Sequence, residues 1–158
     1  MNTQRRDVMK AGGGMTLMTM LVAAGWLRPG EVHAADAWNK AAFETKSLDE
    51  TVKALGGAAP AQSKDITFVQ TPDIAENGAV VLVGVTSAIP KTESIAILVE
   101  KNPNMLAAIF SLPAGTEPSV STRVKMGQSS NVHALVKADG KYYVATKEVK
   151  VTLGGCGG

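Results

Sequence analysis

The stretch 132-VHALVKADGKYYVATKEVKVTL-153 decides the fold that we predict for this chain. Apolar and polar side chains alternate on both sides of Asp139-Gly140, and alternation with a period of two is typical of β-strands. An Asp-Gly pair between two such runs favours a two-residue hairpin turn. The sequence therefore predicts two antiparallel strands, 132–136 and 141–153, joined by a tight turn.

Five further runs with the same apolar or alternating character precede this hairpin. Turn residues separate them, among them Pro72-Asp73, Asn77-Gly78 and Asn102-Pro103-Asn104. The runs are 66–69, 79–85, 94–99, 105–112 and 120–126. Seven short strands with regular turns predict a mainly β fold, a seven-stranded antiparallel immunoglobulin-like β-sandwich that occupies residues 63–153.

Residues 35–62 form a short N-terminal segment of helical character. Ser47-Leu48-Asp49-Glu50 is a capping-box pattern, and Gly56-Gly57 ends the apolar spacing that follows it. Trp38 and Phe43 give the segment an apolar face, and a short helix needs a surface to lie against. This face could pack on the same domain or on another subunit, and the sequence leaves both possibilities open.

Residues 1–34 have the pattern of an export signal. Arg5-Arg6 precedes an uncharged stretch, 11–27, and Val32-His33-Ala34 is a small-x-small cleavage pattern. We predict a twin-arginine signal that is cut after Ala34 and delivers the protein to the periplasm. The alternatives are an uncut signal anchor or a buried helix, although the glycines of the stretch weaken a helix.

The composition of the chain excludes several classes of protein. The 158 residues carry a formal net charge of +2, and without residues 1–34 the charge is zero, with twelve basic and twelve acidic side chains. This balance disfavours a nucleic-acid binder, and after signal cleavage we expect no membrane association. One cysteine cannot form an internal disulfide or a Cys/His zinc cluster. We predict no catalytic residue, no metal and no cofactor.

The chain ends in Gly154-Gly155-Cys156-Gly157-Gly158, its most unusual feature. Glycines give Cys156 no neighbouring side chains, so we expect the thiol to lie on a flexible arm that reaches up to about 10 Å beyond Leu153. A prenylation box would need the cysteine one position earlier. An incidental cysteine in a disordered terminus and an intermolecular disulfide remain open.

This tail, placed after a β-rich domain with a twin-arginine signal, resembles that of SoxY, the family of sulfur carriers in the periplasmic Sox thiosulfate-oxidation system. The resemblance implies that Cys156 carries the substrate covalently and that Gly154, Gly155, Gly157 and Gly158 form its swinging arm. It implies a heterodimer with SoxZ, a second β-sandwich subunit. It also implies transient docking to a c-type cytochrome complex, a thiosulfohydrolase and a sulfane dehydrogenase, with no catalysis by the carrier itself.

Three other residues near the end of the chain are weaker candidates. A single strand histidine such as His133 is usually a surface or hydrogen-bonded residue. Lys147 and Lys150 fit a solvated strand edge better than an anion site, and we assign neither a role.

Two other functions compete with the carrier function. A ubiquitin-like carrier would form a thiocarboxylate on Gly158 but has no use for Cys156. A thiol oxidoreductase would normally contain a Cys-x-x-Cys pair, which this chain lacks.

Overall fold

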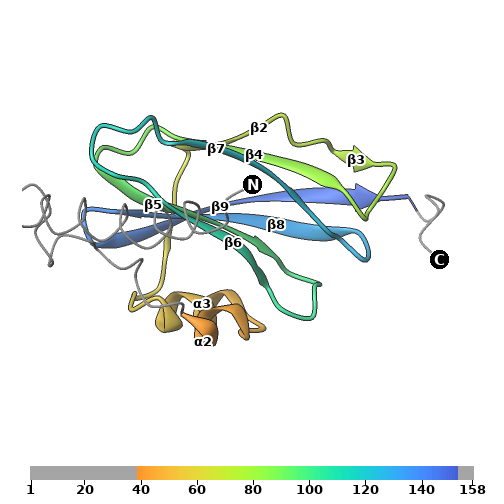
Figure 1. The fold of residues 1–158 in the computed structure, drawn as a ribbon, viewed down its shortest axis with the longest axis horizontal. Helices are drawn as coiled ribbons and strands as arrows, with labels where there is room; N and C mark the ends of the chain where they lie inside the picture. Colours follow the sequence, from red (N-terminus) through yellow and green to blue (C-terminus); the bar gives the residue numbers. More distant parts are fainter. Residues whose placement is uncertain (1–38, 153–158) are drawn as a thin grey trace, which may run out of the picture. The chain divides into compact units, whose positions relative to one another are not determined.

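Nine strands and two short helices make up residues 39–152, the part of the chain that the computed structural model describes (Figure 1). The predicted signal 1–34 and the tail 154–158 lie outside the described residues. The elements are α2 (Lys40–Phe43), α3 (Leu48–Ala54), β1 (Ala61–Gln62), β2 (Ile66–Val69), β3 (Ile74–Ala75), β4 (Val81–Ser87), β5 (Thr92–Val99), β6 (Leu106–Ser111), β7 (Ser119–Val124), β8 (Ser130–Ala138) and β9 (Lys141–Val151).

The strands form two sheets of unequal size. The large sheet has the order β1-β9-β8-β5-β6, with β3 also paired to β9, and the small sheet has the order β2-β4-β7. All seven predicted strands are present within a few residues of their predicted bounds. The prediction of a two-sheet, mainly β sandwich is therefore confirmed.

The strand count and the purely antiparallel pairing were wrong. β1 and β3 are two additional strands, and both pair parallel to β9. Two residues are too few to show alternation, and β1 lies inside the segment predicted to be helical. The two short strands lie before and after β2, which belongs to the small sheet. The chain thus pairs twice along the free edge of β9 and crosses to the other sheet in between.

The Asp139-Gly140 hairpin is confirmed. Both residues have positive φ, 49° and 72°, as a two-residue turn of this type requires. The strands on either side stay in register from Ala138 opposite Lys141 to Ser130 opposite Val149.

Two hydrophobic clusters bury the two faces of the large sheet. Ile95 and Ile97 of β5 lie in the cluster that also contains residues of the small sheet, whereas Ala96 and Leu98 belong to a second cluster with α2 and α3. Figure 1 shows the helices beneath the large sheet and the small sheet above it. Burial on both faces explains why β5 reads as a continuous apolar run.

The helices pack on their own sheet, which answers the open question for Phe43, whereas Trp38 lies outside the described residues. Ala42 and Val52 are 0% and 1% exposed. Ser47 caps α3, because its hydroxyl accepts a hydrogen bond from Glu50 N–H at 3.3 Å. The Tyr142 hydroxyl of β9 donates to the carbonyl oxygen of Leu55 at 2.9 Å and ties the end of α3 to the sheet.

Candidate functional site

The end of β9 is the part of the described structure that leads into the glycine-rich tail. Neighbouring segments hold it on both sides. On one side Lys150 N–H donates to Asp73 O (2.9 Å) and Thr152 N–H donates to Ala75 O (3.1 Å). On the other side Val151 N–H donates to the hydroxyl of Ser129 at 2.9 Å. Strand β9 is therefore fixed up to Thr152, the last described residue.

Gly78 packs a third segment against the same end of β9. A Cβ atom at this position would lie 2.3 Å from Met126 O and 2.8 Å from Val151 Cγ1, so only glycine fits. The carbonyl oxygen of Gly78 accepts a hydrogen bond from Met126 N–H at 2.7 Å. This close contact adds to the hydrogen bonds that hold the end of the strand.

The predicted site residues Cys156, Gly154, Gly155, Gly157 and Gly158 all lie outside the described residues. Cys156 is four residues beyond Thr152, so the chain places its Cα within about 14 Å of the anchored strand end. This reach decides which described residues can interact with the thiol in the same chain.

Lys147 and Lys150 lie on opposite faces of the large sheet, because residues three apart on a strand point to opposite sides. Lys147 Nζ lies 3.1 Å from Asp73 Oδ1 and also donates to the carbonyl oxygen of Thr71. Lys150 is exposed. The two lysines therefore do not form one anion site. Lys147 is partly buried and ion-paired rather than part of a solvated strand edge.

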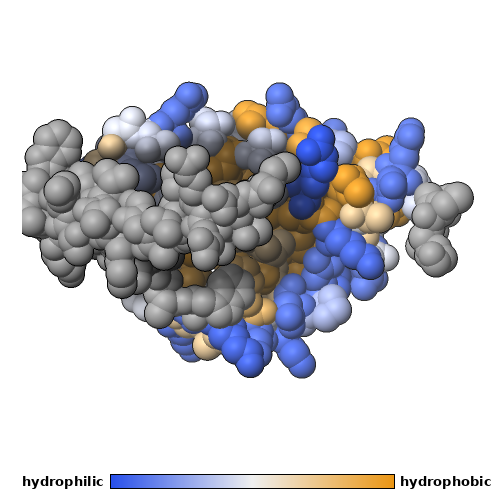
Figure 2. All heavy atoms as spheres, viewed as in Figure 1, coloured by the Kyte–Doolittle hydropathy of each residue, from blue (hydrophilic) through white to orange (hydrophobic). Residues whose placement is uncertain are grey.

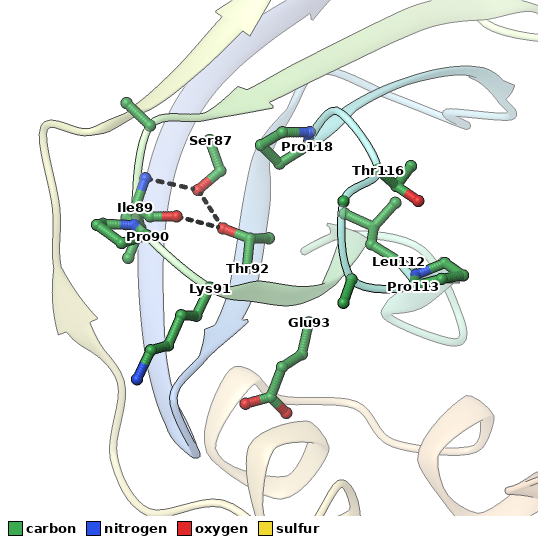
Figure 3. A pocket seen from close by; sticks show the side chains of 13 residues that line it. Ser87, Ile89, Pro90, Lys91, Thr92, Glu93, Leu112, Pro113, Thr116 and Pro118 are labelled. Atoms are coloured by element: carbon green, nitrogen blue, oxygen red, sulfur yellow. Dashed lines mark hydrogen bonds between the residues drawn. The ribbon is translucent and has the colours of Figure 1, made fainter.

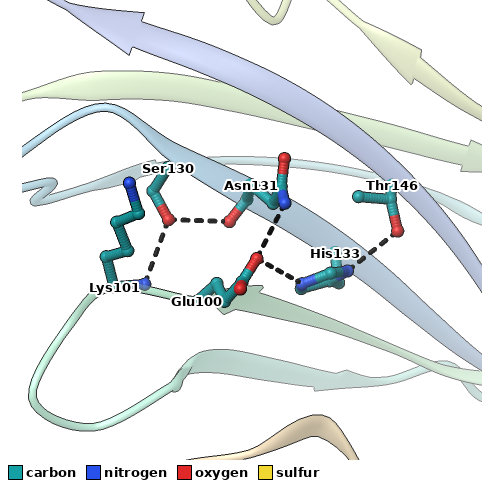
Figure 4. Close-up of polar contacts among 6 residues, drawn as sticks. All are labelled: Glu100, Lys101, Ser130, Asn131, His133 and Thr146. Atoms are coloured by element: carbon teal, nitrogen blue, oxygen red, sulfur yellow. Dashed lines mark hydrogen bonds and ion pairs between the residues drawn. The ribbon is translucent and has the colours of Figure 1, made fainter.

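His133 belongs to a polar cluster on the face of the large sheet opposite the small sheet (Figure 4). Its Nδ1 lies 2.8 Å from the hydroxyl of Thr146, and its Nε2 lies 3.6 Å from Glu100 Oε2. Asn131 Nδ2 donates to the same carboxylate oxygen at 2.8 Å. Burial lowers the pKa of His133 and outweighs the opposite effect of the Glu100 carboxylate.

The cluster lies well back along β9 from the anchored strand end. Thr146, the residue paired with His133, precedes Thr152 by six residues, or about 20 Å of strand. That distance is longer than the reach of about 14 Å of the Cys156 Cα atom. The prediction that His133 is a hydrogen-bonded strand residue is confirmed, but its partner Glu100 was not predicted.

A pocket of about 490 Å³ lies at the other end of the sandwich, between residues 87–93 and 112–118 (Figure 3). The hydroxyls of Ser87 and Thr92 face each other there at 2.9 Å, and Thr92 also donates to Ile89 O at 2.8 Å. Lys91 forms an ion pair with Asp139 of the β8–β9 hairpin at 3.2 Å. Since β9 runs about 35 Å from this hairpin to its anchored end, Cys156 cannot reach the pocket.

Residues 39–152 contain no group of three or more His, Cys, Asp or Glu side chains that could hold a metal ion. Within the same residues no helix is long and apolar enough to cross a membrane. The described part of the structure thus positions a strand end, and the sequence beyond that end supplies the thiol.

Comparison with known proteins identifies this combination. The family model described as "Sulfur oxidation protein SoxY" matches residues 52–156. The solved structure of the sulfur carrier protein SoxY from Chlorobium limicola f thiosulfatophilum is 38% identical, with a TM-score of 0.61, over 67% of this chain and 96% of that one. A superoxide reductase (neelaredoxin) from Ignicoccus hospitalis, variant E23A, is 19% identical over 68% of this chain and all of that one. Its TM-score is 0.49.

The fold and these matches define the class of protein: a β-sandwich carrier of sulfur oxidation. The chain belongs to the SoxY family. Comparison with curated proteins gives no match. Members of this family act as carriers within the Sox system rather than as catalysts.

Proposed function

We propose that this chain carries the intermediates of thiosulfate oxidation covalently on Cys156, and that Gly154, Gly155, Gly157 and Gly158 form the arm that presents them. The observation that carries the proposal is membership of the SoxY family, through a match that extends to residue 156, the single cysteine of the chain. The intermediates are a cysteine S-thiosulfonate, which is held through a sulfur–sulfur bond rather than a thioether, and a persulfide.

The chemistry on the carrier balances in two steps. In the first, Cys156 Sγ forms a disulfide bond with the outer sulfur of thiosulfate, the thiol proton leaves, and two electrons pass to a c-type cytochrome complex. In the second, water cleaves the bond between that sulfur and the sulfonate group, so that sulfate leaves and a persulfide remains. The enzymes for these steps are partners, including a thiosulfohydrolase and then a sulfane dehydrogenase.

The environment of the strand end supports the dependence on partners. His133 is the one histidine of residues 35–158, and its paired residue Thr146 lies six residues before Thr152. Lys147 is already paired with Asp73. We infer that a base or metal that activates the thiol comes from the enzyme that receives the arm.

We further propose that the chain works in the periplasm as a heterodimer with a SoxZ-like β-sandwich subunit. Arg5-Arg6 and the cleavage pattern that ends at Ala34 support twin-arginine export. The packing of α2 and α3 on their own sheet leaves a sheet edge or face for the partner.

Intact-mass spectrometry of the exported protein, after incubation with thiosulfate and the remaining Sox enzymes, tests the proposal. We expect adducts that map to Cys156 and disappear in Cys156→Ser. A modification on Gly158 would support the thiocarboxylate function instead, and unchanged turnover by Cys156→Ser would refute the carrier function. Recovery of a stable monomer without a β-sandwich companion would contradict the heterodimer.

A further inference from the structure

The turn between β3 and β4 contains Asn77-Gly78, the one asparagine–glycine pair in the chain. An asparagine before glycine is a common site of spontaneous deamidation, because glycine has no side chain to keep its backbone nitrogen away from the asparagine amide. This pair lies where Gly78 packs against the end of β9. A change in the backbone of the turn would therefore act on the strand that leads to Cys156.

Asn77 is exposed, as are its neighbours Glu76, Ala79 and Val80. Figure 2 shows hydrophilic side chains at the end of the sandwich where Figure 1 places the connection from β3 to β4. Among residues 39–152 no group accepts a hydrogen bond from Asn77 Nδ2 or from the Gly78 N–H. Water can thus reach the amide, and both the nitrogen that would leave and the nitrogen that would attack are without a competing acceptor there.

The oxygen of the same side-chain amide is held by a backbone donor. Ala79 N–H donates to Asn77 Oδ1 at 2.9 Å, and Val80 N–H donates to the backbone carbonyl oxygen of Asn77 at 3.3 Å. When Gly78 N adds to Asn77 Cγ, negative charge develops on Oδ1, and a donor already aimed at that oxygen stabilises the charge. The folded turn therefore favours the first step of deamidation.

We propose that Asn77 is a site of spontaneous deamidation in the folded protein, and that its isoaspartate product releases the end of β9. Gly78 N forms a bond to Asn77 Cγ and gives its proton to solvent, while the Cγ–Nδ2 bond breaks and the nitrogen leaves as ammonia with a proton from solvent. Water then opens the succinimide ring. Cleavage at Cγ gives aspartate, and cleavage at the backbone carbonyl carbon gives isoaspartate. Neither step needs an oxidant or a reductant, and the inference does not rest on the proposed carrier function.

Isoaspartate adds one methylene group to the main chain, and the turn has no room for it on the side of β9. A Cβ atom on Gly78 would lie 2.3 Å from Met126 O and 2.8 Å from Val151 Cγ1, so Gly78 cannot move in that direction. Movement away from β9 lengthens the 2.7 Å hydrogen bond from Met126 N–H to Gly78 O and weakens the contact with Val151. Aspartate keeps the main chain and an acceptor for Ala79 N–H, so it leaves this packing intact.

Peptide mapping of the full chain, after incubation at mildly alkaline pH in water enriched in oxygen-18, tests the site. We expect the label at position 77, with isoaspartate as a product, while Asn104, which is also exposed but precedes Met105, stays unchanged over the same time. Asn77→Ser is the matched control, because serine can also accept from the N–H two residues on but cannot form a succinimide. Conversion of Asn77 no faster than that of Asn104, or conversion in denaturant but not in the folded chain, would overturn the proposal.

Amide hydrogen exchange of the separated isoaspartate form tests the effect on β9. We expect the Met126 and Val151 amides to lose protection, while the Tyr142 amide at the hairpin end keeps it. Asn77→Asp separates the added charge from the longer main chain, and we expect it to exchange like the unmodified protein. Unchanged protection of Val151 in the isoaspartate form, or an equal loss of protection in Asn77→Asp, would overturn the proposed release of the strand end.

Discussion

The anchor at the end of β9 can be tested by removing one hydroxyl. The hydroxyl of Ser129 accepts a hydrogen bond from Val151 N–H at 2.9 Å and donates to Val151 O at 3.4 Å. Ser129→Ala leaves the Val151 N–H without its partner. A buried unpaired donor costs about 1–3 kcal/mol, and because Val151 is only partly buried we expect about 1–2 kcal/mol. That energy corresponds to a roughly 5- to 30-fold increase in local opening.

Amide hydrogen exchange measures this opening directly. In Ser129→Ala we expect the Val151 amide to exchange faster by that factor, whereas the Tyr142 amide, at the hairpin end of β9, keeps its protection. Ser121→Ala is the control, since Ser121 is an exposed serine on β7. Equal acceleration at Tyr142 would mean global destabilisation, and no acceleration at Val151 would mean that β3 alone holds the strand end. Either result would refute the two-sided anchor.

Three other predictions follow from particular contacts. Because burial lowers the pKa of His133, the unfolded chain binds more protons below about pH 6.5, so the free energy of unfolding falls on acidification. Chemical denaturation at pH 7.5 and 5.5 should show a smaller fall in the free energy of unfolding for His133→Gln than for the unchanged chain. Gly57→Ala places a Cβ 2.4 Å from the ring of Tyr142 and should cost about 1–3 kcal/mol. In Gly127→Ala the new Cβ meets open space, so the loss of stability should be much smaller. Equal falls in melting temperature for the two variants would contradict the packing of Gly57 against Tyr142. Deleting the two glycines before Cys156 shortens the reach by about 7 Å. We expect small thiol reagents to react as before while partner enzymes load less thiosulfate, and unchanged loading would argue against a length requirement.

Local sequence signals predicted the strands that have enough residues to show a period. The alternation on both sides of Asp139-Gly140 predicted the hairpin, and Ser47 was predicted to cap a helix. β1 and β3 could not be found in this way, because each has two residues and forms only where β9 offers a free edge. Their pairing is a tertiary effect that overrides local pattern.

The site shows the same division between local and long-range information. The tail was predicted from its composition alone, since four glycines around one cysteine are a local signal. Glu100, which contacts His133 from a position 33 residues earlier in the chain, could not be predicted from spacing. The opposite orientation of Lys147 and Lys150 was available in the sequence, because a spacing of three on a strand fixes it.

The register of β9 links the fold to the proposed function. A slip by one residue would move the start of the tail by about 3.4 Å, a quarter of the reach of Cys156. The same slip would turn Val149, which is 0% exposed, out of the core and bring a charged neighbour in. The hairpin sets the register at one end, and Asp73, Ala75 and Ser129 hold it at the other. The buried face of β9 thereby fixes the position of Thr152, the residue from which the chain continues toward Cys156.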